Sequence, residues 1–142
     1  GWQVPACPVN GPALSARARD VAVAWFTANG NQPRAFVAFS SDAGRTFGSP
    51  VRLDDEATLG RVDIELLPDG SAAAAYVEFA NKRASFRVRR IARDGARSAP
   101  ITIAVLEGTR TSGLPRMALF GDALYFAWIE GDVVRTARAV LP

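Results

Sequence analysis

The sequence predicts an all-β protein built from repeated, four-stranded antiparallel units. Short apolar runs alternate with turn residues along the whole chain, and 12 Gly and 9 Pro are spread among 142 residues rather than clustered. No segment shows the 3.6-residue apolar period of an amphipathic helix. Because 49% of the residues are apolar and the length suits one domain, we treat residues 1–142 as a single partial domain with its own core.

A repeat of about 50 residues organises the predicted strands. The apolar runs that end in Trp25, Tyr76 and Trp128 occupy equivalent places, and a Gly-led segment precedes each of them. A period of this length is typical of a β-propeller blade. We therefore predict about three blades, the third incomplete, at residues 11–55, 60–106 and 113–142, after a connector at residues 1–10.

Within the blades the turn residues separate short strands of alternating or wholly apolar character. The Ala72–Ala75 run would favour a helix by propensity alone, but small side chains also suit the crowded inner strands of a propeller. The strands are predicted at 12–16, 20–27, 34–41 and 49–53, at 61–67, 71–79, 84–92 and 100–105, and at 115–120, 123–130 and 132–140. The apolar and aromatic stripes on them are interpreted as core between blades: Val21, Val23, Trp25, Tyr76, Tyr125 and Trp128.

The turn before the fourth strand of the first blade reads S-x-D-x-G-x-T-F, with Ser40, Asp42, Gly44, Thr46 and Phe47 at the fixed positions. This stretch resembles the Asp-box, or BNR repeat, of sialidase-type β-propellers. The resemblance implies a structural staple in which Asp and hydroxyl groups bind backbone N–H groups, Gly takes a positive φ, and the aromatic side chain packs beneath. The alternative is an ordinary Asx-turn hairpin. The turn at residues 93–98 is interpreted as a decayed copy.

Three blades do not close a ring, since propellers have about four to eight blades. The resemblance, which extends to the Cys-Pro-Val-Asn-Gly-Pro opening and the Gly-Leu-Pro-Arg segment, implies the C-terminal half of a six-bladed bacterial sialidase-like protein, secreted or periplasmic. The partner would be a second half-propeller, either another chain or a second copy. Relatives carry further cysteines in the other half, which implies a disulfide from Cys7 to a cysteine outside this chain; a buried thiol is the alternative.

Sialidases hold the substrate carboxylate with arginines and use an Asp acid with a Tyr nucleophile and its Glu partner. The resemblance makes Arg61 and Arg116, which begin inner strands, ligand-binding candidates together with Asn10. Asp63, Tyr76 and Glu78 are weak candidates for the catalytic groups, although the first-blade Arg-Ile-Pro motif is absent. The alternative is that Arg61 pairs with Asp63 in a structural network and that Tyr76 packs in the core.

Composition excludes several other chemistries. The sequence has no His, which removes imidazole bases and ligands, and its single Cys cannot build a zinc site. Asp54-Asp55-Glu56 would suit a calcium ion, but a solvated acidic turn is favoured, and we expect no metal or cofactor. A solvated face is likewise favoured over nucleic-acid binding for five arginines at positions 87, 89, 90, 93 and 97. No apolar run is long enough to span a membrane.

These observations leave two functions. The favoured one is an extracytoplasmic, sialidase-like propeller that serves as a scaffold for binding a glycan or a protein. The alternative is part of an exo-α-sialidase-like glycoside hydrolase acting on an anionic sugar.

Overall fold

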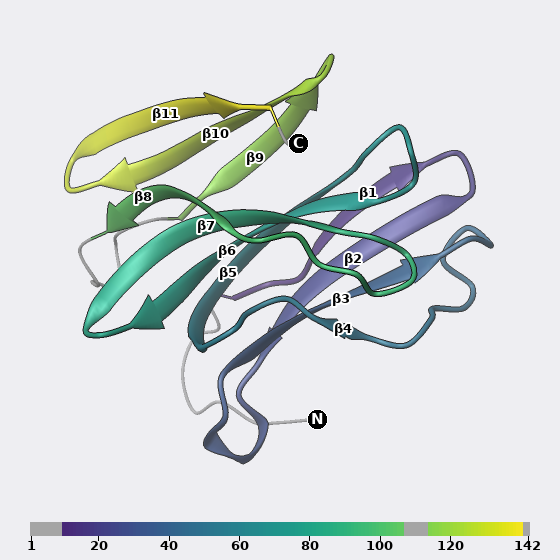
Figure 1. Ribbon diagram of the computed structural model, residues 1–142, viewed down its shortest axis with the longest axis horizontal. Coiled ribbons are helices and arrows are strands. Elements are labelled where there is room, and N and C mark those ends of the chain that lie inside the picture. The colour runs from purple at the N-terminus through teal and green to yellow at the C-terminus, as the bar shows by residue number, and fades with distance from the viewer. Residues whose placement is uncertain (1–9, 107–113, 141–142) are drawn as a thin grey trace.

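Three antiparallel sheets make up the computed structural model, which describes residues 10–106 and 114–140 (Figure 1). Blade 1 has the strand order β1-β2-β3-β4, blade 2 the order β5-β6-β7-β8, and blade 3 the order β9-β10-β11. The strands are β1 (Ala13–Arg17), β2 (Asp20–Thr27), β3 (Arg34–Ser40), β4 (Val51–Arg52), β5 (Ala57–Leu66), β6 (Ala72–Ala80), β7 (Arg83–Ile91), β8 (Ile101–Leu106), β9 (Arg116–Phe120), β10 (Ala123–Glu130) and β11 (Val133–Ala139).

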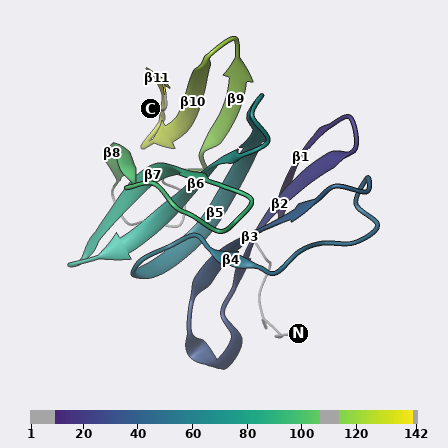
Figure 2. The same ribbon diagram turned by 45° about the vertical axis from the view of Figure 1, so that its right-hand side comes forward.

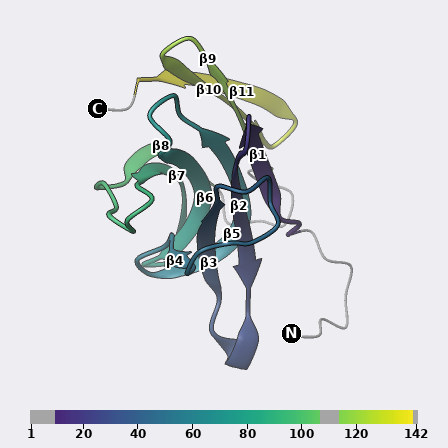
Figure 3. The ribbon, with the colours of Figure 1, turned by 90° about the vertical axis from the view of Figure 1, so that its right-hand side faces the viewer.

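The predicted all-β class and the blade-like sheets are confirmed. Each predicted strand is present, and the Ala72–Ala75 run is a strand because it is buried between two neighbouring sheets. The largest difference is β5, which begins at Ala57 rather than near residue 61. Between Thr58 and Asp63 its register with β6 shifts, and the apolar pattern of the sequence does not predict such shifts. The one helical turn described, η1 (Asn29–Asn31), lies in the long β2–β3 loop that extends beyond the sheet (Figure 3).

The three sheets lie in sequence order, with blade 2 between the other two (Figures 1 and 2). The first strands of the blades, β1, β5 and β9, contact one another along one side, as the inner strands of a propeller do. The short β4 and the longer β8 form the opposite edges of their blades. None of the helices in the described residues is long and apolar enough to cross a membrane.

Two hydrophobic cores fill the spaces between the blades, and both include β6. Side chains alternate along a strand, so Ala74 and Tyr76 face blade 1 while Ala75 and Val77 face blade 3. The first core joins Ala22, Ala24, Val37, Leu53 and Ile64 to the even-numbered side of β6. The second joins Phe86, Met117, Leu124, Phe126 and Trp128 to the odd-numbered side. Phe86 contacts Phe126 and Trp128 edge to face.

The interpretation of the aromatic stripes as core is correct for only part of the set. Tyr76 and Trp128 are buried between blades. Trp25 is half-buried and stacks on Phe36 with ring centroids 5.7 Å apart, and Tyr125 is 42% exposed. Strand alternation is the reason, because these two residues lie on the sides of blades 1 and 3 that face away from blade 2.

The turn at residues 40–47 forms the predicted network of hydrogen bonds. The Asp42 carboxylate accepts hydrogen bonds from the Thr46 N–H at 2.9 Å, from the Thr46 hydroxyl at 2.7 Å and from the Ser40 hydroxyl at 2.7 Å. Ser40 Oγ accepts the Gly44 N–H at 3.0 Å, and Gly44 has φ +80°. The expected position of Phe47 was wrong, because its side chain is 42% exposed rather than packed beneath the turn.

These hydrogen bonds make the turn sensitive to acid. They lower the pKa of Asp42 from 3.8 to about 2, chiefly through Thr46. Because the folded-state pKa is depressed, ionised Asp42 stabilises the fold above pH 4, and this contribution is lost as the pH falls from about 4 to about 2. The difference in free energy of unfolding between wild type and Asp42→Asn, measured by urea denaturation, should therefore shrink over that range. Asp122→Asn, at an exposed carboxylate, is the control. If the difference in free energy of unfolding between wild type and Asp42→Asn did not change with pH, Asp42 would not be the acid-sensitive group.

Candidate functional site

A pocket of about 300 Å³ opens between the middle of β5 and the start of β9. Arg61, predicted to begin its inner strand, lies within β5 because that strand begins at Ala57. The pocket contains all three of the residues predicted to bind ligand, Asn10, Arg61 and Arg116, although they are far apart in the sequence. The remainder of its wall is small or apolar: Gly11, Pro12, Ala13, Val62, Leu114 and Pro115. The lining is thus divided between polar and apolar groups, and convergent polar groups in a concavity are one feature of a small-ligand site.

Arg61 enters the pocket from a bulge in β5. The ladder with β6 pairs Gly60 with Val77 and Asp63 with Ala75, so Arg61 and Val62 together oppose the single residue between them. Gly60 and Arg61 both have positive φ, +75° and +53°. Burial lowers the pKa of the Arg61 guanidinium, but arginine stays protonated in proteins at neutral pH.

Arg116 begins β9 and is exposed. The Asp63 carboxylate fixes the start of this strand, since it accepts the Met117 N–H at 2.8 Å and the Ile64 N–H at 3.0 Å. Asp63 therefore joins blade 2 to blade 3 beside the pocket. Both arginines carry positive charge into one small concavity, which suits a carboxylate or another oxyanion because a guanidinium can bind two oxygens at once.

Asn10 is not simply a pocket-lining side chain. Its Oδ1 accepts the Arg61 N–H at 2.8 Å, and its Nδ2 donates to the Leu59 carbonyl at 3.0 Å. Both ends of the amide are thus used by the backbone of the β5 bulge. Its direct contact with a ligand stays a prediction.

Tyr76 and Glu78 lie in the interior and are absent from the residues lining the pocket. Tyr76 is fully buried, its hydroxyl has no hydrogen-bond partner among the described residues, and burial raises its pKa to about 12. Glu78 is 1% exposed; it pairs with Arg87 and accepts the N–H groups of Asp55 and Glu56 at 3.2 and 3.1 Å. Neither side chain is accessible to a substrate in the pocket, as a catalytic group must be.

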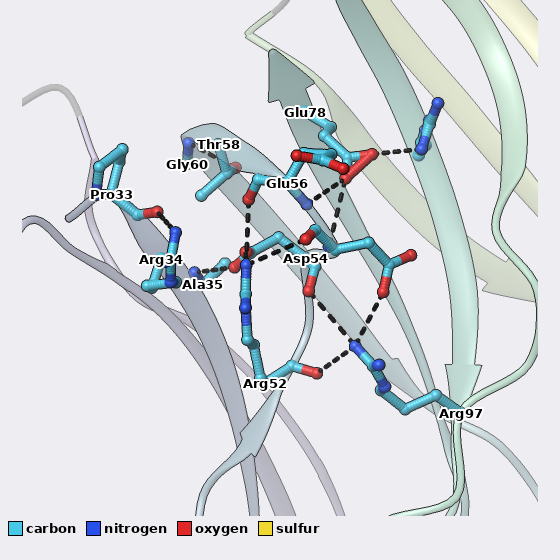
Figure 4. A network of polar contacts seen from close by, with 12 residues as sticks. Pro33, Arg34, Ala35, Arg52, Asp54, Glu56, Thr58, Gly60, Glu78 and Arg97 are labelled. Carbon is cyan, nitrogen blue, oxygen red and sulfur yellow. Dashed lines mark hydrogen bonds and ion pairs between the residues drawn. The ribbon is translucent and has the colours of Figure 1, made fainter. Parts of the chain in front are cut away.

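Glu78 belongs to a polar network that joins blade 1 to blade 2 (Figure 4). Asp54, fully buried, accepts the Ala35 N–H at 2.6 Å and two hydrogen bonds from Arg52 at 2.6 and 2.9 Å. Arg97 reaches across from blade 2 and donates to the carbonyls of Arg52 and Asp54 at 3.1 and 3.3 Å. The expectation of a solvated acidic turn is therefore wrong for Asp54, because arginines and backbone amides surround it.

The five clustered arginines also differ in part from the expected solvated face. Arg89 is 2% exposed and pairs with Asp55, whose pKa its hydrogen bond lowers. Every member of the cluster has a carboxylate partner: Arg87 with Glu78, Arg89 with Asp55, Arg90 with Asp69, Arg93 with Asp20, and Arg97 with Asp55. These pairs link strands and blades. The expected solvated face is correct for Arg93 and Arg97, which are exposed, and wrong for Arg89.

Sequence reasoning missed one carboxylate on the inner strands. Glu65 is half-buried, and its Oε2 accepts the Ser15 hydroxyl of β1 at 3.1 Å. Burial raises the pKa of Glu65, the Ser15 hydrogen bond opposes this, and the nearby Asp63 charge assists it. The alternation of Arg61, Asp63 and Glu65 along β5 was the available signal, since polar residues repeating with a period of two mark one side of a strand.

Among the described residues no group of three or more acidic or cysteine side chains is arranged to hold a metal ion. Cys7 lies outside the described residues, so its predicted disulfide stays a prediction.

No family model and no curated protein matches this sequence. Solved structures do match. A xylan β-1,4-xylosidase from Bacillus halodurans C-125 has a TM-score of 0.58 at 11% identity, over 90% of this chain and 27% of the xylosidase chain. The GH43 protein BlXynB from Bacillus licheniformis has a TM-score of 0.56 at 17% identity, and a mutant of it 0.54 at 16%, with the same coverage.

The described chain is part of a β-propeller. It spans about a quarter of the length of these solved structures, which agrees with three sheets that do not close a ring. At these identities the likeness concerns the fold alone, and it does not single out sialidases. The number of blades in the complete ring stays a prediction.

Proposed function

We propose that this chain is the part of an extracytoplasmic β-propeller that binds an anionic glycan in the pocket between Arg61 and Arg116. The observation that carries the proposal is that two arginines, one within β5 and one at the start of the neighbouring inner strand β9, line one concavity of about 300 Å³. A sugar carboxylate would accept charge-assisted hydrogen bonds from both guanidinium groups. The apolar walls at Pro12, Leu114 and Pro115 would contact the sugar ring.

Two further observations support a glycan over a protein ligand. The pocket has the volume of a small molecule rather than the flat area of a protein interface. In addition, proteins whose structures resemble this fold include a xylan β-1,4-xylosidase.

Hydrolysis of an anionic sugar is the second candidate, and the carboxylates of Asp63 and Glu65 favour it. They follow Arg61 on the same strand, and the pKa of Glu65 is raised, as a general acid requires. Both carboxylates already hold structural hydrogen bonds between blades, and Tyr76 and Glu78 are buried. Binding without turnover is therefore the favoured function.

The proposed site needs a closed ring, so we include a second half-propeller as partner. The sides of blades 1 and 3 that face away from blade 2 expose large apolar residues, among them Leu14 at 64% and Val134 at 68%. Apolar sheet faces of this kind pack on further blades in a propeller. The mass of the purified particle by light scattering distinguishes a second copy from a different chain.

The test is isothermal titration of that particle with N-acetylneuraminic acid, glucuronic acid and, as the neutral comparison, glucose. We expect an acidic sugar to bind, glucose not to bind, and Arg116→Ala to weaken binding by about tenfold or more, since a hydrogen bond to a charged group contributes about 1.5–3 kcal/mol. Arg135→Ala, at an exposed arginine outside the pocket, is the matched control.

Equal affinity of wild type and Arg116→Ala, or no binding of either acid, would overturn the proposal. Release of the fluorophore from a fluorogenic sialoside, abolished by Arg116→Ala, would favour the hydrolase instead.

A further inference from the structure

The bulge at Gly60 and Arg61 is the most unusual backbone in the pocket. A positive φ is ordinary for Gly60 but costs energy for an arginine, and such conformations persist only where the surroundings hold them. Strained residues of this kind gather at binding sites, and bulges redirect side chains there. What holds this bulge is therefore relevant to what Arg61 does.

The contacts come from a residue that is remote in the sequence. Asn10 lies before β1, about 50 residues from the bulge, and its amide binds both sides of it: the Arg61 N–H at 2.8 Å and the Leu59 carbonyl at 3.0 Å. The fit around Gly60 is also close. A Cβ at Gly60 would lie 2.8 Å from Asn10 Oδ1 and 2.8 Å from Cγ of Phe26. Asn10 and Phe26 thus enclose the bulge from the connector and from blade 1.

The amide fits this task because it offers an acceptor and a donor on one rigid group. The register with β6 skips Arg61 and Val62, and the Arg61 N–H donates to Asn10 Oδ1 instead of to the ladder. A shift of Asn10 would remove this hydrogen bond and allow Arg61 to relax to the ordinary extended conformation, in which its side chain would point in another direction.

We infer that Asn10 is a positioning residue for anion recognition: by clamping the β5 bulge it keeps Arg61 in the left-handed conformation that directs the guanidinium into the pocket. The inference rests on the proposed function for its ligand and changes the role of Asn10 from contacting the ligand to holding the residue that contacts it. Anion affinity then depends on a residue that need not touch the anion.

Asn10→Ala tests the inference with two readouts on the assembled particle, the affinity for N-acetylneuraminic acid and the position of the Arg61 Nε–H signal in a ¹⁵N-correlated NMR spectrum. We expect affinity to fall by about tenfold, since the geometry of one guanidinium is lost, and the Arg61 signal to move. Asn29→Ala is the matched control, because Asn29 is an exposed asparagine that does not line the pocket. It should leave the affinity within about twofold of wild type and the Arg61 signal at its wild-type position.

Asn10→Asp separates position from charge, and it keeps an acceptor for the Arg61 N–H if Asn10→Ala does not fold. We expect the Arg61 signal to stay near its wild-type position while affinity for the acid falls, because a negative charge is added. An unmoved Arg61 signal in Asn10→Ala, or a moved one in Asn10→Asp, would overturn the inference. Absence of binding by wild type would overturn the proposed function alone, since the NMR signal still reports on the clamp.

Discussion

Replacement of Asp54 by alanine should lower the free energy of unfolding by about 1–3 kcal/mol, the usual cost of leaving a buried hydrogen-bond donor without its acceptor. Asp54 is fully buried and accepts three hydrogen bonds, from the Ala35 N–H and from two nitrogens of Arg52. The variant leaves the Ala35 amide without its acceptor and removes the carboxylate that orients Arg52. The Arg52 side chain, which is 38% exposed, can be solvated in the variant. Both partners of the carboxylate belong to blade 1, so the loss should first affect the β3–β4 side of that blade, where the Asp54 carbonyl accepts Arg97 of blade 2.

Urea denaturation followed by tryptophan fluorescence measures this effect. Glu56→Ala is the matched control, since Glu56 is exposed two residues away and engages the network through its backbone. It should change the free energy of unfolding by less than about 0.5 kcal/mol. Equal effects of the two substitutions would show that the network carries little of the stability.

Gly60→Ala should destabilise the protein at least as strongly, and for a different reason. The left-handed conformation alone costs an alanine about 1–3 kcal/mol at most such positions. Here the added Cβ would also lie 2.8 Å from both Asn10 Oδ1 and Phe26 Cγ, closer than packed atoms approach. The connector or blade 1 must therefore move away from the bulge, and Arg61 must lose its clamped position.

Gly121→Ala is the control for the cost of placing an alanine at a positive φ. Gly121 also has a positive φ, +62°, but a Cβ there would meet nothing within 4 Å. The difference between the two variants in free energy of unfolding, measured by the same denaturation, isolates the steric part. If the two costs are equal, the close packing around Gly60 is not important for stability.

The repeat and the turn chemistry were enough to predict the architecture. Alternating apolar runs, Gly-containing turns and a 50-residue period are local or periodic signals, so the eleven strands follow from them with errors of a few residues. The hydrogen bonds of Ser40 and Asp42 were predictable for the same reason, because donors and acceptors lie within six residues of one another.

The site was predicted only in part. Arg61 and Arg116 were placed together because the repeat gives them equivalent places on neighbouring inner strands, although β5 begins four residues before Arg61. The burial of Tyr76 followed from the apolar stripe. The burial of Glu78 was not predictable in this way, since it is accompanied by Arg87 and by backbone amides of residues 55 and 56. The role of Asn10 was missed because neither periodicity nor composition encodes a bulge.

The alternation of side chains along β6 has a consequence for how this protein can evolve. Ala74 and Ala75 are neighbours in the chain, yet they belong to different packing environments, one facing blade 1 and the other facing blade 3. A larger side chain at either position needs a compensating change in only one of the two adjacent blades. One strand can therefore accumulate substitutions at two interfaces independently, which would allow repeated blades to diverge in sequence while each junction stays closely packed.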